Sequence, residues 1–272
     1  MILNNLTGCI FLICFSFTTI SGAYANKKTE QDLAKLNSGF QAAITSNDTV
    51  KSGLLLRSII KALSKEENDN LTTSNSQYLI GVYYLLSGNN REAFSWLSLS
   101  ASLREQTGSR DEIYAKCLFN LGIASSNLGD YKRMEEYSLR SLEVDESLYG
   151  ETDPILLKGL SALVTAYFNL KDYSKAILFG NKALSLIWEP REEDASNLAI
   201  LYSNLGACHT QLSDYSKAVL YLEKAESFYR EYSLPEDEDY INLLNSLAAN
   251  YFFLGQTDKS DEYFNKVDIT VR

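Results

Sequence analysis

The stretch Tyr202–Ala225 reads YSNLGACHTQLSDYSKAVLYLEKA, and it has the pattern of two helices joined by a short turn. Its first half places apolar side chains at helical intervals, at Leu205, Cys208 and Leu212. Asp214 then stands where an N-cap is needed, because its carboxylate can accept from the free N–H groups of the following helix. The stretch is therefore predicted to form a pair of antiparallel helices.

The same pattern recurs at a spacing of 42 residues. Four segments align without gaps: Leu118–Ser141, Leu160–Ala183, Tyr202–Ala225 and Leu244–Val267. An earlier copy with Ile80-Gly81 and Gly88-Asn89 precedes them by 41 residues, and a weaker helix pair is predicted over Glu30–Ser64. A single pair cannot bury its apolar face, but stacked pairs can, so the repeats are expected to form one continuous core.

Small residues mark the expected contact between the two helices of a pair. Gly81, Gly122, Gly206 and Ala248 lie on first helices and are expected to face Ala93, Ala176 and Ala218 on second helices. Tyr131, Tyr173 and Tyr215 follow the turns and are expected to pack on the next repeat.

These residues carry a family resemblance. Asn204-Leu205-Gly206, Asp214-Tyr215-Ser216-Lys217-Ala218 and Ala225 resemble the tetratricopeptide repeat (TPR). The 42-residue period and the connector from Ser141 to Gly150 resemble its kinesin-light-chain-type branch. The resemblance covers residues 73–268 and implies an all-α fold, a right-handed α-solenoid of stacked antiparallel helix pairs. The chain departs from the family pattern at four positions: Val164, Lys171, Ser213 and Thr257.

The first residues have the features of a targeting signal. Residues 10–20 are uncharged and mostly apolar, and Ala23 and Ala25 fit a cleavage site after Ala25. Leu6-Thr7-Gly8-Cys9 resembles a lipoprotein box, but this cysteine precedes the apolar run, so a lipid anchor is a less favoured alternative. An uncleaved membrane anchor is the other alternative. The predicted organisation is a signal peptide over 1–25, a degenerate helix pair over 26–70 and an array of about five repeats over 71–272. A secreted or periplasmic protein with no membrane span in its mature part is expected.

The charge disfavours one class of partner. The net charge is −10, and the first 26 residues contain no charged side chain, so an acidic body is expected to repel nucleic acid. Cys117 and Cys208, the only cysteines after the signal, fall on apolar helix faces and are interpreted as buried free thiols.

No residue set points to catalysis. His209 takes the position that Tyr167 and Tyr251 hold in other repeats, and it is interpreted as a packed aromatic substitute. One histidine and two scattered cysteines do not make a metal site, and no phosphate-binding loop is present, so neither a cofactor nor an enzyme activity is predicted. The acidic run Glu236–Asp239 is interpreted as the first turn of a helix, with a cation site as the alternative.

The resemblance places a peptide-binding surface on the concave side, which first helices line. The expected binding residues are mostly amides and aromatics: Phe119, Asn120, Asn127, Asn169, Asn204, Gln211, Asn245 and Phe252. Amides can donate and accept, which suits the backbone of an extended segment. The alternative is a groove that only stays hydrated.

The sequence therefore predicts a non-catalytic scaffold or adaptor that binds a protein or peptide outside the cytoplasm. Two alternatives stay open: a sensor or regulatory input domain, and self-association through the C-terminal repeat. The second rests on Phe264, Val267 and Ile269, which are expected to be exposed because no further helix pair follows them.

Overall fold

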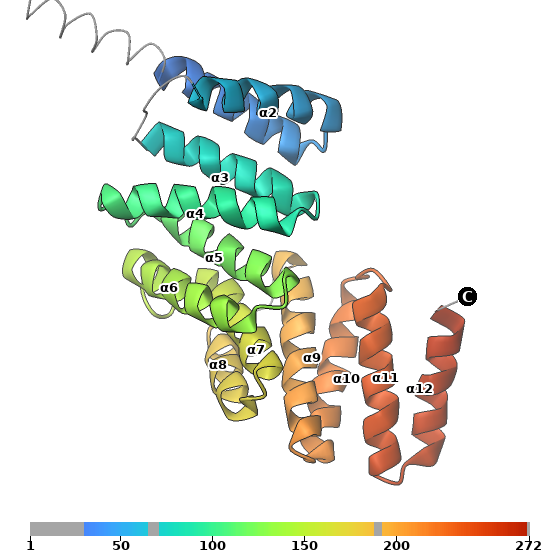
Figure 1. Cartoon of the computed structure of the whole chain (residues 1–272). Coiled ribbons are helices and arrows are strands. Elements are labelled where there is room, and N and C mark those ends of the chain that lie inside the picture. Colours follow the sequence, from blue (N-terminus) through green and yellow to red (C-terminus); the bar gives the residue numbers. More distant parts are fainter. Residues whose placement is uncertain (1–29, 65–70, 188–191, 271–272) are drawn as a thin grey trace, which may run out of the picture. The chain divides into compact units, whose positions relative to one another are not determined.

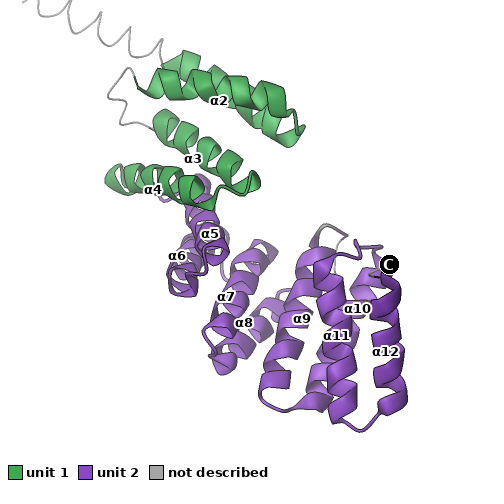
Figure 2. Cartoon of the chain, turned by 45° about the vertical axis from the view of Figure 1, so that its right-hand side comes forward, with its two compact units in different colours: residues 1–109 green, residues 110–272 purple. Residues whose placement is uncertain are grey.

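Helices and short 3₁₀ turns are the only regular structure in residues 30–64, 71–187 and 192–270, the part of the chain that the computed structural model describes (Figure 1). The predicted all-α repeat fold is confirmed. The predicted signal peptide lies outside the described residues. The chain divides into two compact units, residues 1–109 and residues 110–272 (Figure 2).

The described part of unit 1 contains two helix pairs. Its helices are residues 30–45, α2 (Thr49–Leu63), α3 (Leu71–Leu86) and α4 (Asn90–Gln106). Its core joins both pairs, because Phe40 and Ile59 from the first pair belong to one buried cluster with Leu79 and Ile80 of α3. The first pair covers the stretch in which the sequence predicts a degenerate pair.

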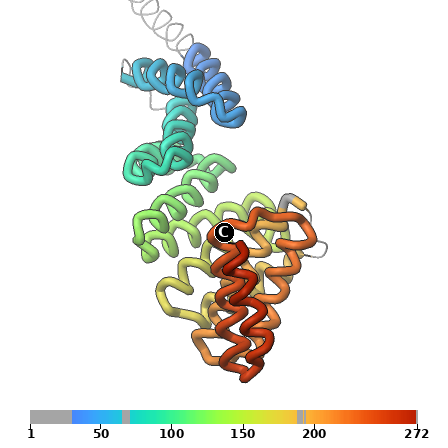
Figure 3. The backbone as a smooth tube through the Cα atoms, turned by 90° about the vertical axis from the view of Figure 1, so that its right-hand side faces the viewer, coloured from blue at the N-terminus to red at the C-terminus, as the bar shows by residue number. Residues whose placement is uncertain are grey.

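In unit 2 the structure describes four helix pairs. Its helices are α5 (Glu112–Asn127), α6 (Tyr131–Tyr149), α7 (Leu157–Asn169), α8 (Tyr173–Ser185), α9 (Ala195–Gln211), α10 (Tyr215–Glu231), α11 (Glu238–Phe253) and α12 (Thr257–Thr270). In each pair the odd-numbered helix is the first helix and the even-numbered helix is the second. The last pair, α11 and α12, runs side by side in red in Figure 3.

The core of unit 2 passes from one repeat to the next without a break. One buried cluster extends from Leu142 of α6 to Phe228 of α10, and a second joins α10, α11 and α12. Tyr202 and Tyr229 pack against both clusters. Each pair thus buries its apolar face against its neighbours, as a solenoid requires.

The turn inside each pair has the same backbone conformation. Six residues, one per pair, have a positive φ: Asn47 (54°), Gly88 (74°), Gly129 (76°), Lys171 (62°), Ser213 (59°) and Gly255 (72°). The next residue donates its N–H to the carbonyl five positions earlier, as in Asp48 to Ala43 and Asp214 to His209, which closes the helix end. Lys171 and Ser213 therefore adopt the left-handed conformation although glycine would do so more easily.

The capping residues are nearly all where the sequence places them. The carboxylates of Asp130, Asp172 and Asp214 accept from backbone N–H groups three residues later. Asn89 is the exception, because it stands at the N-cap of α4 but its side chain makes no capping hydrogen bond.

The helices of a pair approach closely at glycine, and a Cβ on Gly206 would lie 3.1 Å from the carbonyl oxygen of Ala218, the expected partner, with a leucine side chain closer still. A Cβ on Gly206 would lie 2.6 Å from Cγ of Leu222, and one on Gly81 would lie 2.6 Å from Cγ of Leu97. These leucines lie one turn beyond the alanines that the pattern suggested. The large neighbour needs more room than an alanine would, which is why the facing position is glycine.

The turn tyrosines contact the next repeat as predicted. The ring of Tyr215 stacks on Phe253 of α11 at 4.7 Å. Tyr173 donates its hydroxyl to Oε1 of Gln211 at 3.4 Å, and Tyr131 packs near Ala162 and Ala166 of α7.

Candidate functional site

The first helices of unit 2 form one surface. α5 packs on α7, α7 on α9, and α9 on α11, so each first helix is next to that of the following repeat. Two clefts open on this surface, and Ile200 of α9 lines both. We call the two clefts together the first-helix groove.

The cleft nearer α5 has a volume of about 430 Å³. Three first helices and one buried methionine line it: Phe119, Ile123, Ser126 and Asn127 from α5, Met134 from α6, Lys158, Ser161, Ala162 and Thr165 from α7, and Asn197 and Ile200 from α9. Its α5 side combines two apolar residues, Phe119 and Ile123, with the polar Ser126 and Asn127, and its α7 side carries the hydroxyl groups of Ser161 and Thr165. Lys158 is the only charged residue in the described part of this lining.

The cleft nearer α11 has a volume of about 290 Å³. Its lining is again a mixture of apolar, amide and hydroxyl side chains: Phe168, Ile200, Ser203, Asn204, Ala207, Leu222, Tyr229, Asp239, Asn242, Leu243 and Ser246. Among the lining residues that the structure describes, Asp239 is the only charged one. Burial, and then the nearby carboxylates of Asp237 and Glu238, raise the pKa of Asp239. Burial and the same acidic turn raise the pKa of Tyr229 to about 12.

The lining positions follow the 42-residue period. Lys158, Ile200 and Asn242 are equivalent positions of successive repeats. The same holds for Ser161 and Ser203. The groove is therefore a repeated surface whose chemistry changes from repeat to repeat.

Hydrogen bonds fix part of the polar lining. Asn204 donates from Nδ2 to Oγ1 of Thr165 at 3.0 Å, and Thr165 donates to the carbonyl of Ser161 at 3.2 Å. These two hydrogen bonds tie α9 to α7 and set the orientation of the Asn204 amide. Oγ of Ser161 is buried and has no hydrogen-bond partner.

The eight predicted binding residues divide into two groups. Phe119 and Asn127 line the cleft nearer α5, and Asn204 lines the other. The other five do not line either cleft: Asn120, Asn169, Gln211, Asn245 and Phe252. Of these, Asn169 donates to the carbonyl of Thr165 in its own helix, and Phe252 is 61% exposed at the end of α11.

Sequence reasoning missed the residues one turn earlier on the same helices. Lys158, Ile200 and Asn242 lie three positions before Ser161, Ser203 and Asn245. Helical spacing puts side chains three apart on one face, so extending the register by one turn toward the N-terminus would have found them.

His209 and the cysteines have structural surroundings. The His209 ring is buried and stacks on Tyr221 at 5.3 Å, and its Nδ1 lies 3.7 Å from Oδ2 of Asp214. Burial lowers the pKa of His209, with a smaller opposing effect of Asp214. Cys117 and Cys208 are buried free thiols, as predicted, and burial raises the pKa of Cys208 to about 12. A neutral buried thiol is a poor nucleophile.

The acidic run before α11 acts as a helix start. Asp237 is the N-cap, and its carboxylate accepts from the backbone N–H groups of Asp239 and Tyr240. In the described ranges no group of three or more histidine, cysteine or acidic residues is arranged to hold a metal ion. None of the helices in these ranges is both long and apolar enough to cross a membrane.

The comparison with family models agrees with this repeat geometry. The model of the tetratricopeptide repeat matches residues 114–187 and 197–267, more than half of the chain. The chain belongs to the tetratricopeptide repeat family. Both matched stretches lie in unit 2, where this TPR chain carries the first-helix groove. A comparison with curated protein sequences finds no match.

Several solved structures share the TPR fold. The apo form of the quorum sensor NprR from B. thuringiensis has a TM-score of 0.75 at 14% identity, over 97% of this chain and 73% of that one. NprR in complex with its cognate peptide NprX has a TM-score of 0.63 at 15% identity, over 96% and 75%. BtubC (BKLC) from P. vanneervenii has a TM-score of 0.63 at 17% identity, over 79% and 92%. Rap protein complexed with Competence and Sporulation Factor has a TM-score of 0.59 at 17% identity, over 89% and 76%.

Proposed function

We propose that unit 2 is a non-catalytic module that binds an extended peptide segment in the first-helix groove. The observation that carries this proposal is the lining of the two clefts: apolar side chains are mixed with amides and hydroxyls, and the described lining of each cleft includes one charged residue. Apolar pockets hold side chains of a segment, while amides and hydroxyls can pair with its backbone.

The related structures support a peptide ligand. NprR was solved with its cognate peptide NprX, and Rap was solved with Competence and Sporulation Factor. TPR folds in general act as binding modules and not as enzymes. The surroundings of His209 and Cys208 agree with this, because both side chains are buried in the helical core and burial favours the neutral thiol of Cys208, which is a poor nucleophile.

The test uses a display library of random linear peptides, selected on the purified chain, with binding of recovered peptides measured by fluorescence anisotropy. Ile200→Glu places a carboxylate where the clefts meet, and we expect it to weaken binding by about tenfold or more. The control is Leu178→Glu on α8, a leucine that is 65% exposed and lines neither cleft, and it should bind as the wild type does.

Two results would overturn the proposal. One is a selection on the wild type that recovers nothing above background. The other is equal binding by Ile200→Glu and the wild type.

Sedimentation of the purified chain separates peptide capture from self-association through α12, where Phe264 is 48% and Ile269 is 73% exposed.

The mature chain is proposed to act outside the cytoplasm. The support is the apolar run over residues 10–20 and the small residues Ala23 and Ala25. N-terminal sequencing of the protein from its native cells should find Asn26 as the first residue. A chain that keeps its first residues and stays in the cytoplasm would contradict this proposal.

A further inference from the structure

Two charges of opposite sign lie at different positions along the first-helix groove. Lys158 on α7 lines the cleft nearer α5, and Asp239 on α11 lines the other. Ile200, on the helix between them, is shared by both clefts. The groove therefore carries a cation, an apolar side chain and an anion in that order across three successive first helices.

Neither charge has an ion-pair partner among the residues that the structure describes. The equivalent of Lys158 one repeat earlier is Lys116, and it pairs with Glu112 at 2.6 Å. Most other lysines of unit 2 are paired in the same way, as Lys175 is with Asp172 and Lys217 with Asp214. The two charges in the groove are thus left available to a ligand.

A contribution to the stability of the fold does not explain why a lysine stands at position 158. It is the second residue of α7, but the 3₁₀ turn Pro154–Leu156 leads directly into α7, so Lys158 lies beyond the first helical turn and the helix dipole does not favour a cation there. Asp239 is favoured by the dipole of α11, but it stands beside Asp237 and Glu238 and is partly desolvated, so its charged form lacks a counter-charge. A cationic group in the cleft would supply that counter-charge.

The spacing of the helices sets the spacing of the ligand groups. α9 packs on both α7 and α11, and packed helices lie about 8–10 Å apart. An extended chain advances about 3.3 Å per residue, so about six residues cross from α7 to α11. The middle of such a segment lies over Ile200.

We propose that the groove selects a segment with a cationic residue beside Asp239, an apolar residue over Ile200 and an anionic residue beside Lys158, the two charged residues being about six positions apart. This inference rests on the proposed function and adds the chemistry of the partner. A purely acidic segment would meet repulsion at Asp239 and its acidic neighbours, and a purely basic one would meet repulsion at Lys158.

The test selects the same library of random linear peptides in parallel on the wild type, on Lys158→Glu and on Asp239→Lys. The wild type should enrich peptides that carry one charge of each sign around an apolar residue. Lys158→Glu should shift the selection to cationic peptides, and Asp239→Lys should shift it to anionic ones, each by about tenfold in the ratio of the two classes.

Matched controls separate the groove from the change in net charge. Lys132→Glu reverses a lysine on α6 outside both clefts, and Asp258→Lys reverses an aspartate in the first turn of α12. Both should select the same peptides as the wild type. Circular dichroism of every variant checks that it is folded.

The outcomes distinguish the two proposals. If all variants select peptides of the same charge composition while Ile200→Glu abolishes selection, the charge inference is overturned and peptide binding stands. If the controls shift the selection as much as the groove variants do, the inference is also overturned. If the wild type selects nothing, both proposals fail.

Discussion

At the scale of single residues, burial and the position in the repeat determine the protonation and packing of His209. His209 is the only histidine of the chain, and it occupies a position that holds Tyr167 and Tyr251 in neighbouring repeats. A lysine eight residues later lies over each of those tyrosine rings, Lys175 at 5.0 Å and Lys259 at 4.6 Å. The imidazole therefore stands in an aromatic site of the core and is held neutral by burial.

The first prediction concerns pH. Because burial lowers the pKa of His209 in the folded state, the unfolded chain binds more protons, so stability should fall as pH decreases through the ordinary imidazole pKa of 6.5. The loss should level off below the folded-state pKa. His209→Phe should remove this component, measured as the difference between the two proteins in urea unfolding at a series of pH values.

Asp145 changes the stability in the opposite direction as pH falls. The contribution of His209 must therefore be measured as the difference between the wild type and His209→Phe. Burial, and then Glu112, raise the pKa of Asp145 from 3.8 to about 6. The folded state therefore gains stability as pH falls from about 6 toward 3.8. If the wild type and His209→Phe show parallel profiles, His209 does not titrate as argued.

At the level of helices, glycine lies at contacts of two kinds, one within a pair and one between neighbouring pairs. A methyl group on Gly206 would lie 2.6 Å from Leu222 and 3.1 Å from the carbonyl oxygen of Ala218. On α7, a methyl group on Gly159 would meet Leu142 at 3.8 Å, which is an ordinary contact. Replacing each glycine by alanine therefore separates the steric cost of an added methyl group from the gain in helix propensity.

The second prediction compares these glycines. Gly206→Ala should destabilise unit 2 by about 1–3 kcal/mol, because the added methyl overpacks the contact between α9 and α10. Gly159→Ala should be neutral or stabilise by up to about 1 kcal/mol through helix propensity. Urea unfolding followed by circular dichroism measures both. Equal effects of the two variants would show that the helices adjust freely.

The helix pairs were predictable because four copies repeat one pattern. The pair at residues 30–63 could have been placed with the same certainty from Asn47-Asp48, which lies 41 residues before Gly88-Asn89 and forms the same turn. The alanines used instead are weaker markers, since alanine suits any helix. Three groove residues were missed because no shared residue type marks them. Lys158, Ile200 and Asn242 hold one position of the repeat with different chemistry, so only the helical register connects them to Ser161, Ser203 and Asn245.

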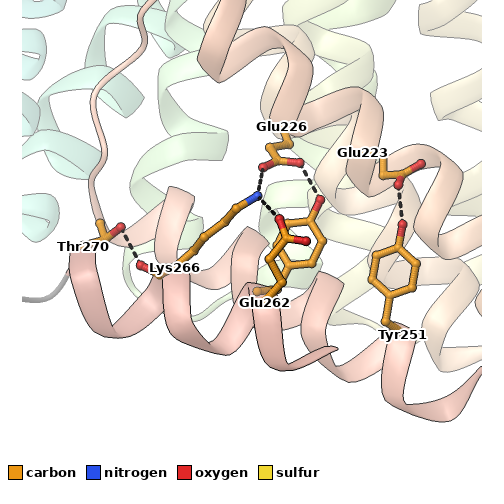
Figure 4. A network of polar contacts seen from close by, with 7 residues as sticks. Glu223, Glu226, Tyr251, Glu262, Lys266 and Thr270 are labelled. Carbon is orange, nitrogen blue, oxygen red and sulfur yellow. Dashed lines mark hydrogen bonds and ion pairs between the residues drawn. The ribbon is translucent and has the colours of Figure 1, made fainter. Parts of the chain in front are cut away.

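In unit 2 as a whole, each repeat is stabilised mainly by the repeats next to it. Among the described residues, α12 packs on α11 and makes polar contacts with α10. Figure 4 shows polar groups that tie α10 to α11 and α12. Tyr251 donates to Glu223, and Tyr263 donates to Oε2 of Glu226 at 2.7 Å. Lys266 lies 3.4 Å from Glu226 and 3.2 Å from Glu262. Glu226 is thus the residue through which two groups of α12 reach across to α10.

The third prediction follows from this dependence on neighbours. Glu226→Ala removes the acceptor of Tyr263 and one partner of Lys266, and it should destabilise α12 locally by about 1–3 kcal/mol. Hydrogen exchange should therefore become faster in α12, with little change in α5 to α8, because in a solenoid each repeat contacts only the next. Glu262→Gln is the control: its side chain is 62% exposed and pairs with Lys266 within one helix, which is worth about 0.3–0.5 kcal/mol. Uniformly faster exchange from α5 to α12 would instead mean that the four pairs of unit 2 open as one cooperative body.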